Sequence, residues 1–158
     1  MYPESEQQLT YETTAAVYFF THAFDALSNW SAHAVELWGQ RFQTAEHAFQ
    51  WRKFNGHEPD IASQVLAANS PWAAIQINKT AGQGRLPGDW HEARAGIMAE
   101  ILRAKAAHHE DVRECLRRTN GKTIVENHPV DAFWGCGPAG DGQNMMGVLW
   151  MQVREELK

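Results

Sequence analysis

The sequence predicts an α+β fold, a helix-rich single domain with a small β-sheet. Helix-start residues precede most stretches whose apolar residues recur at helical spacing, whereas only three short stretches have the composition of strands. A chain of 158 residues has the usual length of one domain and buries roughly two thirds of the surface of its unfolded form. We expect a polar N-terminal arm over residues 1–14 and one folded domain over residues 15–158.

Strands are predicted at three places. Residues 15–20 form a short apolar run, and residues 32–42 alternate between two faces with a turn at Gly39-Gln40. The third candidate is the β-branched pair Ile124-Val125.

The first predicted helices are recognised by their starts and stops. Thr44 can cap a helix that runs to residues 55–56, where Asn-Gly is a typical stop. Pro59 and Pro71 each stand where the first turn of a helix accepts proline, and Ser70 can cap the second of these helices.

Two further helices carry clear apolar faces. Asp89 and Glu92 have capping-box spacing and begin a long helix, whose expected inner face is Ile97, Met98, Ile101 and Leu102. Asn120-Gly121 ends the helical stretch that follows. The last helix begins near Asn144, and its expected inner face is Met146, Leu149, Trp150 and Val153.

The composition argues against several classes of protein. The formal net charge is −5, whereas a protein that binds duplex nucleic acid needs a basic face. Cys115 and Cys136 are too few for a disulfide framework and lack metal-ligand spacing. The N-terminus is polar and acidic, and no long apolar run is present. We therefore expect a cytoplasmic protein without a signal peptide, a membrane span, a cofactor or a bound metal.

Residues 134–147, WGCGPAGDGQNMMG, have the glycine spacing of a dinucleotide-binding fingerprint. That fingerprint requires a buried strand before it and a crossover helix after it. Here the preceding residues are not strand-like, Pro138 lacks an N–H for a pyrophosphate, and too little chain follows. The sequence therefore does not predict a Rossmann site, and the glycines need another explanation.

Residues 44–54 predict a pocket wall on one helix face. Glu46, Phe49, Gln50 and Lys53 have the spacing i, i+3, i+4 and i+7, so they share that face. The alternative is that Glu46 stabilises the helix dipole and Lys53 is solvated. Pattern alone leaves both interpretations open.

Two other stretches are more polar and aromatic than packing requires. Ser28 and Asn29 form a turn between apolar residues, which a simple Ser or Asx turn also explains. The other stretch combines Asp131, Trp134 and Asn144 with glycines that permit close backbone approach. A surface loop without function would have a similar composition.

Taken in order, these stretches resemble the NADAR (YbiA-like) N-glycosidase family. The resemblance covers most of the chain and rests on the ordered set rather than on any one piece. Its motifs are FF at 19–20, SNW at 28–30, EHAFQWRKF at 46–54, DW at 89–90, IM at 97–98, Lys105, RTNGKTIVE at 118–126, DAFWGCG at 131–137 and GQNMMGVLWMQVR at 142–154.

The resemblance implies an enzyme that hydrolyses the C1′–N bond of ribosylamines. Members of the family act on phosphoribosylaminopyrimidine intermediates of riboflavin synthesis, or remove ADP-ribose from guanine, either free or within nucleic acid. Carried over, the catalytic residues are Glu46, Lys53 and Asp131. The implied substrate-binding residues are Ser28, Asn29, Gln50, Arg85, Trp90, Glu126, Trp134, Gly135 and Asn144.

The mechanism has open alternatives. Glu46 is expected to act as acid or base at the leaving nitrogen or the attacking water, because a glycosylamine has a poor leaving group. Lys53 is expected either to anchor an anionic group or to attack the ring-opened imine as a nucleophile.

Two functions are alternatives to the N-glycosidase activity. One is a non-catalytic module that binds ADP-ribose or a nucleotide. The other is a metal-dependent hydrolase that uses some of the eight histidines, although no histidine pair has ligand spacing with a partner acid.

Overall fold

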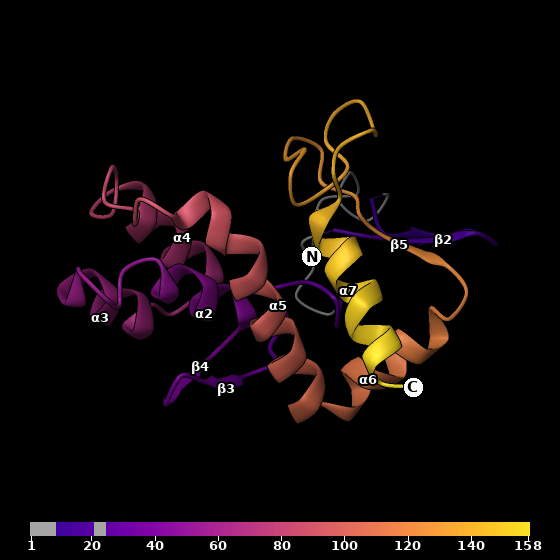
Figure 1. Ribbon diagram of the computed structural model, residues 1–158, viewed down its shortest axis with the longest axis horizontal. Helices are drawn as coiled ribbons and strands as arrows, with labels where there is room; N and C mark the ends of the chain where they lie inside the picture. Colours follow the sequence, from indigo (N-terminus) through magenta and orange to yellow (C-terminus); the bar gives the residue numbers. More distant parts are fainter. Residues whose placement is uncertain (1–8, 21–24) are drawn as a thin grey trace. The chain divides into compact units, whose positions relative to one another are not determined.

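The computed structural model describes residues 9–20 and 25–158, and this part of the chain divides into two compact units. The first unit comprises residues 9–20, 25–31 and 109–158, and the second comprises residues 32–108. Six helices and two small sheets are present among the described residues (Figure 1). The helix-rich α+β class is confirmed.

A three-stranded sheet organises the first unit. Its order is β1 (Tyr11–Glu12), β2 (Ala16–Phe19) and β5 (Thr123–Glu126). β1 is antiparallel to β2, whereas β2 and β5 are parallel and pair Ala16 with Thr123. The strands expected at 15–20 and 124–125 are confirmed. β1 lies within the segment expected to be an arm, and its Tyr11 ring stacks on Tyr18 with centroids 4.4 Å apart.

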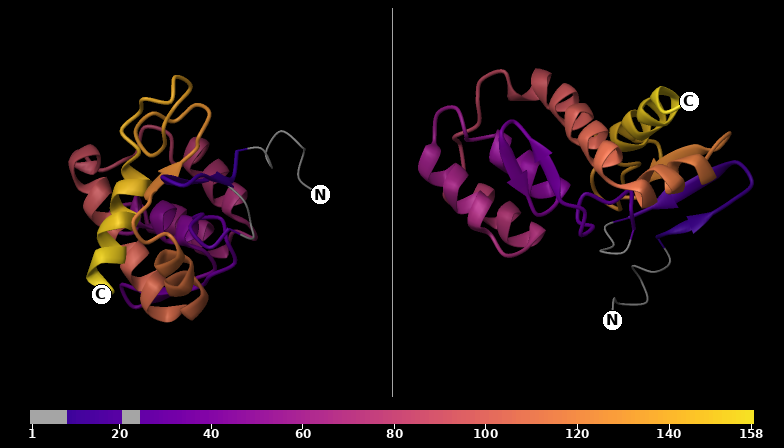
Figure 2. Two further views of the ribbon diagram at one scale, coloured as in Figure 1. Left: turned by 90° about the vertical axis from the view of Figure 1, so that its right-hand side faces the viewer. Right: turned by 90° about the horizontal axis from the view of Figure 1, so that it is seen from below.

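Helix α7 (Met145–Glu156) packs along β5, as the views in Figures 1 and 2 show. The shorter α6 (Glu110–Arg118) packs against α7. The expected inner face of α7 is confirmed, since Met146, Leu149, Trp150 and Val153 are all buried. The Trp150 indole N–H donates to the Leu27 carbonyl at 3.0 Å, which satisfies its only polar group.

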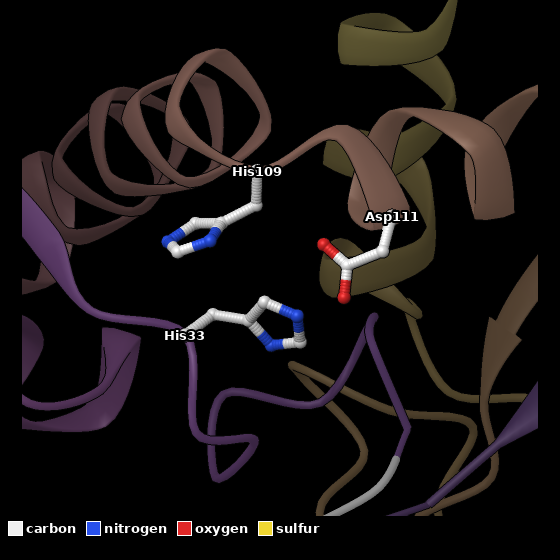
Figure 3. Close-up of side chains that lie close together, drawn as sticks. All are labelled: His33, His109 and Asp111. Atoms are coloured by element: carbon white, nitrogen blue, oxygen red, sulfur yellow. The ribbon is translucent and has the colours of Figure 1, made fainter.

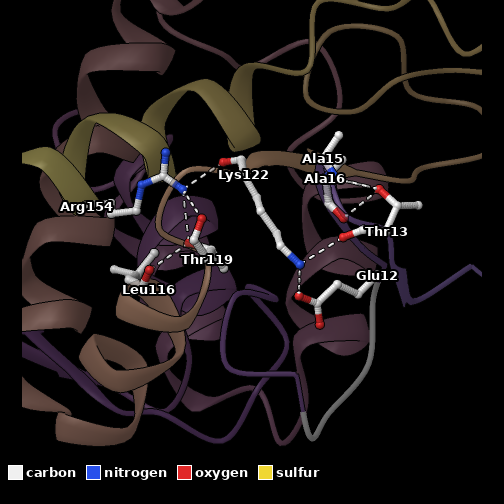
Figure 4. A network of polar contacts seen from close by, with 8 residues as sticks. All are labelled: Glu12, Thr13, Ala15, Ala16, Leu116, Thr119, Lys122 and Arg154. Carbon is white, nitrogen blue, oxygen red and sulfur yellow. Dashed lines mark hydrogen bonds and ion pairs between the residues drawn. The ribbon is translucent and has the colours of Figure 1, made fainter.

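Arg154, near the end of α7, connects this helix to the turn after α6 (Figure 4). Its Nη1 donates to the carbonyls of Thr119 at 2.6 Å and Lys122 at 2.8 Å. The Lys122 side chain in turn pairs with Glu12 and donates to the Thr13 carbonyl at 2.8 Å. One polar network thus connects α7, the start of β5 and the end of β1.

The second unit begins with a hairpin of β3 (Val35–Leu37) and β4 (Gln40–Phe42). The strand region expected at 32–42 is confirmed, but the expected turn at Gly39-Gln40 is wrong by one residue. The turn is Trp38-Gly39, with φ of 53° and 74°. Two positive φ values match the twist of a two-residue hairpin, and glycine supplies only one of them.

Four helices follow in the second unit: α2 (Ala45–Arg52), α3 (Pro59–Ala67), α4 (Pro71–Lys79) and α5 (Trp90–His108). The Thr44 and Ser70 caps are confirmed, since each side chain accepts a hydrogen bond from a backbone N–H of the first turn. α2 ends at Arg52, earlier than expected, and turns continue to residue 57. On α5, Met98, Ile101 and Leu102 are buried as expected, while Ile97 is only partly buried.

A compact apolar core joins α2, α3 and α4. It contains the buried residues Phe54, Ile61, Ala62, Val65, Ala68 and Ala74. His47 of α2 is 1% exposed and its Nε2 lies 3.1 Å from the Ala68 carbonyl. Because a carbonyl only accepts, Nε2 carries the proton, and burial lowers the pKa of this histidine. His47 therefore holds α2 in place.

No helix among the described residues is both long and apolar enough to span a membrane.

Candidate active site

One face of α2 carries an acid, an amide and an amine, all buried. Glu46 is 9% exposed, Gln50 is 4% exposed and Lys53 is 8% exposed. The Thr44 cap fixes where α2 begins, so the helical period places Glu46 in the first turn and Lys53 at the C-terminal end on the same face. The solvated alternative for these residues is therefore excluded within this unit.

The Gln50 amide is the link between helix turns on this face. Its Nε2 donates to Glu46 Oε1 at 2.6 Å. Its Oε1 is buried and has no hydrogen-bond partner among the described residues. A buried carbonyl that lacks a donor costs free energy.

The Lys53 amine lies close to two aromatic rings that contact each other. Its Nζ is 4.9 Å from the Phe49 ring centroid and 5.5 Å from that of Trp90. Burial lowers the pKa of Lys53 to about 8, the Arg94 charge adds to this, and Glu46 opposes it. The neutral, nucleophilic form of this amine is therefore easier to reach near neutral pH than that of an ordinary lysine.

The carboxyl group of Glu46 is shifted in the opposite direction. Burial raises its pKa, against the smaller effects of the Gln50 hydrogen bond and the Lys53 charge. The two pKa values therefore approach each other, so an acid that can hold a proton lies on the same face as an amine that can lose one. This is the pattern of an acid–base site.

Arg85 is on the surface of the second unit. It pairs with Glu58 at 3.2 Å, and its carbonyl accepts a hydrogen bond from His57 Nε2 at 2.6 Å. Trp90, by contrast, is 4% exposed and contacts Phe49 with ring centroids 5.2 Å apart. Of the predicted site residues, the second unit thus brings together Glu46, Gln50, Lys53 and Trp90.

The remaining predicted site residues belong to the first unit, where Asp131 organises a turn. Its Oδ1 accepts hydrogen bonds from the backbone N–H of Phe133 at 2.8 Å and of Trp134 at 2.7 Å. Trp134 is partly buried and meets Phe133 edge-to-face. The catalytic role of Asp131 stays a prediction. In the structure its carboxylate stabilises the turn that leads to Trp134.

The Asn144 amide extends the edge of the sheet. Asn144 has a φ of 50°, and its Oδ1 accepts from the Glu126 N–H at 2.9 Å while its Nδ2 donates to the Ile124 carbonyl at 2.8 Å. The Glu126 carbonyl accepts from the Cys136 N–H at 2.9 Å. The side chain expected to bind substrate thus hydrogen-bonds to the β5 backbone through both of its polar atoms.

Close packing explains glycines of the 134–147 loop. A Cβ on Gly135 would lie 2.5 Å from the His128 Cβ and 2.8 Å from the Glu126 carbonyl oxygen. A Cβ on Gly147 would lie 1.9 Å from the Ile124 carbonyl oxygen. Gly135 and Gly147 thus let the loop and the first turn of α7 lie directly against β5 and its continuation.

Ser28 and Asn29 form the simple turn that the sequence allowed. Ser28 is 3% exposed, its Oγ accepts from the Trp30 N–H at 3.1 Å, and its carbonyl accepts from Ser31. Asn29 Nδ2 lies 3.9 Å from the Met146 sulfur, a weak contact.

Histidine and carboxylate also meet at the start of α6, where His109 is the N-cap residue and Asp111 lies in the first turn (Figure 3). Figure 3 also draws His33, which belongs to the second unit. Two ligands within one unit are fewer than a catalytic zinc site uses.

Sequence reasoning missed Arg94 as a neighbour of Lys53. Arg94 follows Trp90 by four residues on α5, so helical spacing places both on one face. The spacing of Trp90 and Arg94 could therefore have indicated that Arg94 lies near Lys53.

A helix-rich α+β scaffold with a buried acid and a buried amine on one helix is suited to acid–base and imine chemistry. The family model of the NADAR domain matches residues 17–158, and the chain belongs to this family.

Relatives cover nearly the whole chain. An N-glycosidase of Nostoc punctiforme is 34% identical over 145 residues, which cover 90% of this chain and 92% of the relative. The solved structure of the Escherichia coli protein YbiA is similar with a TM-score of 0.76 and 28% identity, covering 96% of this chain and 90% of that one. A chloroplastic riboflavin biosynthesis protein of Zea mays is 31% identical, over 93% of this chain but only 26% of the longer relative.

Proposed function

We propose that this protein is an N-glycosidase that hydrolyses the C1′–N bond of a ribosylamine-type substrate. The observation that carries the proposal is the buried face of α2, where the pKa of Glu46 is raised and that of Lys53 is lowered to about 8. Family membership and the N-glycosidase name of the Nostoc relative support the same class of reaction.

Glu46 supplies the proton that the leaving group needs. An amine or ring nitrogen leaves C1′ poorly unless it is protonated, and a carboxyl group with a raised pKa keeps its proton closer to neutral pH. Gln50 holds the carboxyl group in place through the 2.6 Å hydrogen bond.

Lys53 serves as the nucleophile in the route that we favour. A ribosylamine opens to an imine, and the neutral Lys53 amine adds to C1 of that imine. The base then leaves as an amine with a proton from Glu46, and Lys53 is left as a Schiff base to the sugar. Water hydrolyses this Schiff base, which releases the sugar aldehyde and restores the amine. In the other route Lys53 only anchors an anionic group.

Two substrate classes remain within the proposal. The riboflavin biosynthesis name of the Zea mays relative favours an aminopyrimidine ribosylamine, and the family resemblance also allows ADP-ribosylated guanine. Separate incubations with a ribosylaminopyrimidine and with ADP-ribosylated DNA, followed by mass spectrometry of the products, test both. Release of a free base from either substrate supports the proposal.

The alternative is a module that binds such ligands without turnover. It predicts saturable binding and no free base over time with both substrates, an outcome that would overturn the proposed activity. A buried acid with a raised pKa next to an amine with a lowered pKa argues against it, because binding alone does not need both.

A further inference from the structure

A small cavity lies between the ends of α6 and α7, entirely within the first unit. Its volume is about 130 Å³, roughly that of four water molecules in the liquid. Three cations, one amide and two leucines line it. They are Arg117, Arg154, Lys158, Asn120, Leu116 and Leu157, and no acid is among the described residues of the lining. The charge of the lining therefore favours an anionic ligand.

Arg154 supplies a donor that is held in place and is still available. Its side chain is only 10% exposed, and its Nη1 is fixed by the Thr119 and Lys122 carbonyls. Its Nε is enclosed, whereas Nη2 is not fully enclosed and has no hydrogen-bond partner among the described residues. Figure 4 shows Nη2 turned away from the Thr119 carbonyl. A ligand in the cavity can therefore accept from Nη2 without breaking the bonds that hold the side chain.

The cavity lies at a helix C-terminus, whose carbonyl groups would repel an anion if they were free. Here they have donors of their own. The Leu116 carbonyl accepts from Thr119 Oγ1 at 2.7 Å, and the Thr119 carbonyl accepts from Arg154 Nη1 at 2.6 Å. These donors offset the negative end of α6, so the cations determine the charge that a ligand meets.

Arg117 and Asn120 add donors at the exposed side of the cavity. Arg117 is 60% exposed, and its Nη1 pairs with Glu110 at 2.8 Å. Its other guanidinium nitrogens and the Asn120 amide have no hydrogen-bond partner in the part of the chain that the structure describes. Glu110 does not line the cavity, so its pairing leaves the donors on the cavity side unused.

From this arrangement we infer that the cavity binds a small organic carboxylate. The carboxylate group accepts from Arg154 Nη2 and the Asn120 amide, with the Arg117 charge beside it. A short apolar chain covers Leu116, which is buried, and Leu157, which is 42% exposed. Inorganic phosphate would satisfy the cations but would leave both leucines without an apolar partner.

The inference goes beyond the proposed function and does not depend on it. No residue of the buried face of α2 takes part, and ligand binding at the end of α7 needs no turnover. Loss of the N-glycosidase activity from the proposal would leave the carboxylate site standing, and the reverse also holds.

The test is a titration with sodium butyrate at constant ionic strength, followed by NMR of the backbone amides. Butyramide, which has the same shape without the charge, is the comparison ligand. We expect saturable shifts in residues 116–120 and 154–158 with butyrate in the millimolar range. Butyramide should bind at least about tenfold more weakly, because it loses the charge-assisted hydrogen bonds.

Two variants test the donors. Arg117→Gln should weaken butyrate binding up to about fivefold, as expected for an exposed charge. Arg118→Gln is the matched control, because Arg118 is the next residue of α6, is exposed, pairs with Glu114 at 2.6 Å and does not line the cavity. It should bind butyrate like the wild type.

Arg154→Lys keeps the charge but removes Nη2, and it should weaken butyrate binding about tenfold. A thermal melt without ligand shows whether this variant is folded, and Arg117→Gln carries the test if it is not.

Three results would overturn the inference. Butyramide that binds as tightly as butyrate would mean that the cations take no part. Equal butyrate affinity in Arg117→Gln and the wild type would have the same meaning. Inorganic phosphate that binds more tightly than butyrate would mean that the leucines take no part, and the ligand class would then be wrong.

Discussion

The buried face of α2 and the loop of residues 134–147 looked alike in sequence, because both mix polar, aromatic and small residues. Their polar groups differ in how they are used. In the loop region, Asp131 and Asn144 bond to backbone N–H and carbonyl groups. On α2, Gln50 Oε1 has no partner among the described residues, and Lys53 faces aromatic rings. The Asp131 and Asn144 side chains thus shape the fold through the backbone, whereas the face of α2 holds its acid and amine in a buried environment.

The variant Lys53→Arg should have the largest effect, because it tests whether the buried face of α2 carries a reacting amine. Arginine keeps the positive charge but is not a nucleophile at neutral pH. We expect turnover to fall more than about 10³-fold. Borohydride added during wild-type turnover should trap a sugar adduct on the Lys53 peptide, detected by mass spectrometry. Lys79→Arg, at the exposed end of α4, is the control. A Lys53→Arg enzyme with most of its activity and no trapped adduct would make Lys53 a binding cation.

Glu46→Gln tests the acid on the same face. The amide keeps the size of the side chain but cannot transfer the proton, so kcat should fall about 10²–10⁴-fold with substrate binding largely kept. Release of base over time measures the effect. Glu92→Gln, exposed in the first turn of α5, should behave like the wild type. Activity of Glu46→Gln within threefold of the wild type would remove Glu46 from the mechanism.

Asn144→Ala tests the loop side of the comparison through stability. The change removes two hydrogen bonds to β5 and places alanine at a φ of 50°. The free energy of unfolding should fall by about 2–4 kcal/mol, measured by urea titration. Asn120→Ala, exposed after α6, should change it little. If Asn144→Ala is as stable as the wild type but inactive, the amide acts on substrate rather than on the fold.

The last prediction concerns how the free energy of unfolding changes with pH above pH 8. The pKa of Lys53 is about 8 in the folded chain and 10.5 when unperturbed. The unfolded chain therefore binds more protons between these values, so the free energy of unfolding rises with pH there by up to roughly 1.4 kcal/mol per pH unit. Lys53→Met should reduce this slope, measured by urea unfolding from pH 8 to pH 10. An unchanged slope would mean that Lys53 is solvated.

Local signals in the sequence were enough to place most helices. Thr44 and Ser70 bond to N–H groups within their own first turn, so neighbouring residues determine where α2 and α4 begin. The turn at Trp38-Gly39 was placed one residue late because a tryptophan with positive φ is not a turn signal. β1 was missed because a two-residue strand is determined by its pairing with β2.

The sequence was enough to predict which residues share the candidate site, but not how deeply they are buried or what they bond to. Helical spacing placed Glu46, Gln50 and Lys53 on one face, but their burial depends on α5, which begins far along the chain. In the same way Asn144 was correctly placed at a helix start, but its hydrogen bonds to Ile124 and Glu126 depend on packing against β5. Spacing along one element is local information, whereas desolvation and backbone partners are set by the tertiary fold.

The parallel pairing of β2 with β5 has a consequence for the order of folding. It joins Ala16 to Thr123, with the whole of residues 32–108 between them. Closing so long a loop is entropically costly while that segment is a flexible coil, and the cost is smaller once the segment has become compact. The contacts within residues 32–108 are shorter in range, so we expect this segment to collapse first and the three-stranded sheet to form late. Hydrogen exchange during refolding should therefore protect the amides of α2 and α3 before those of β5.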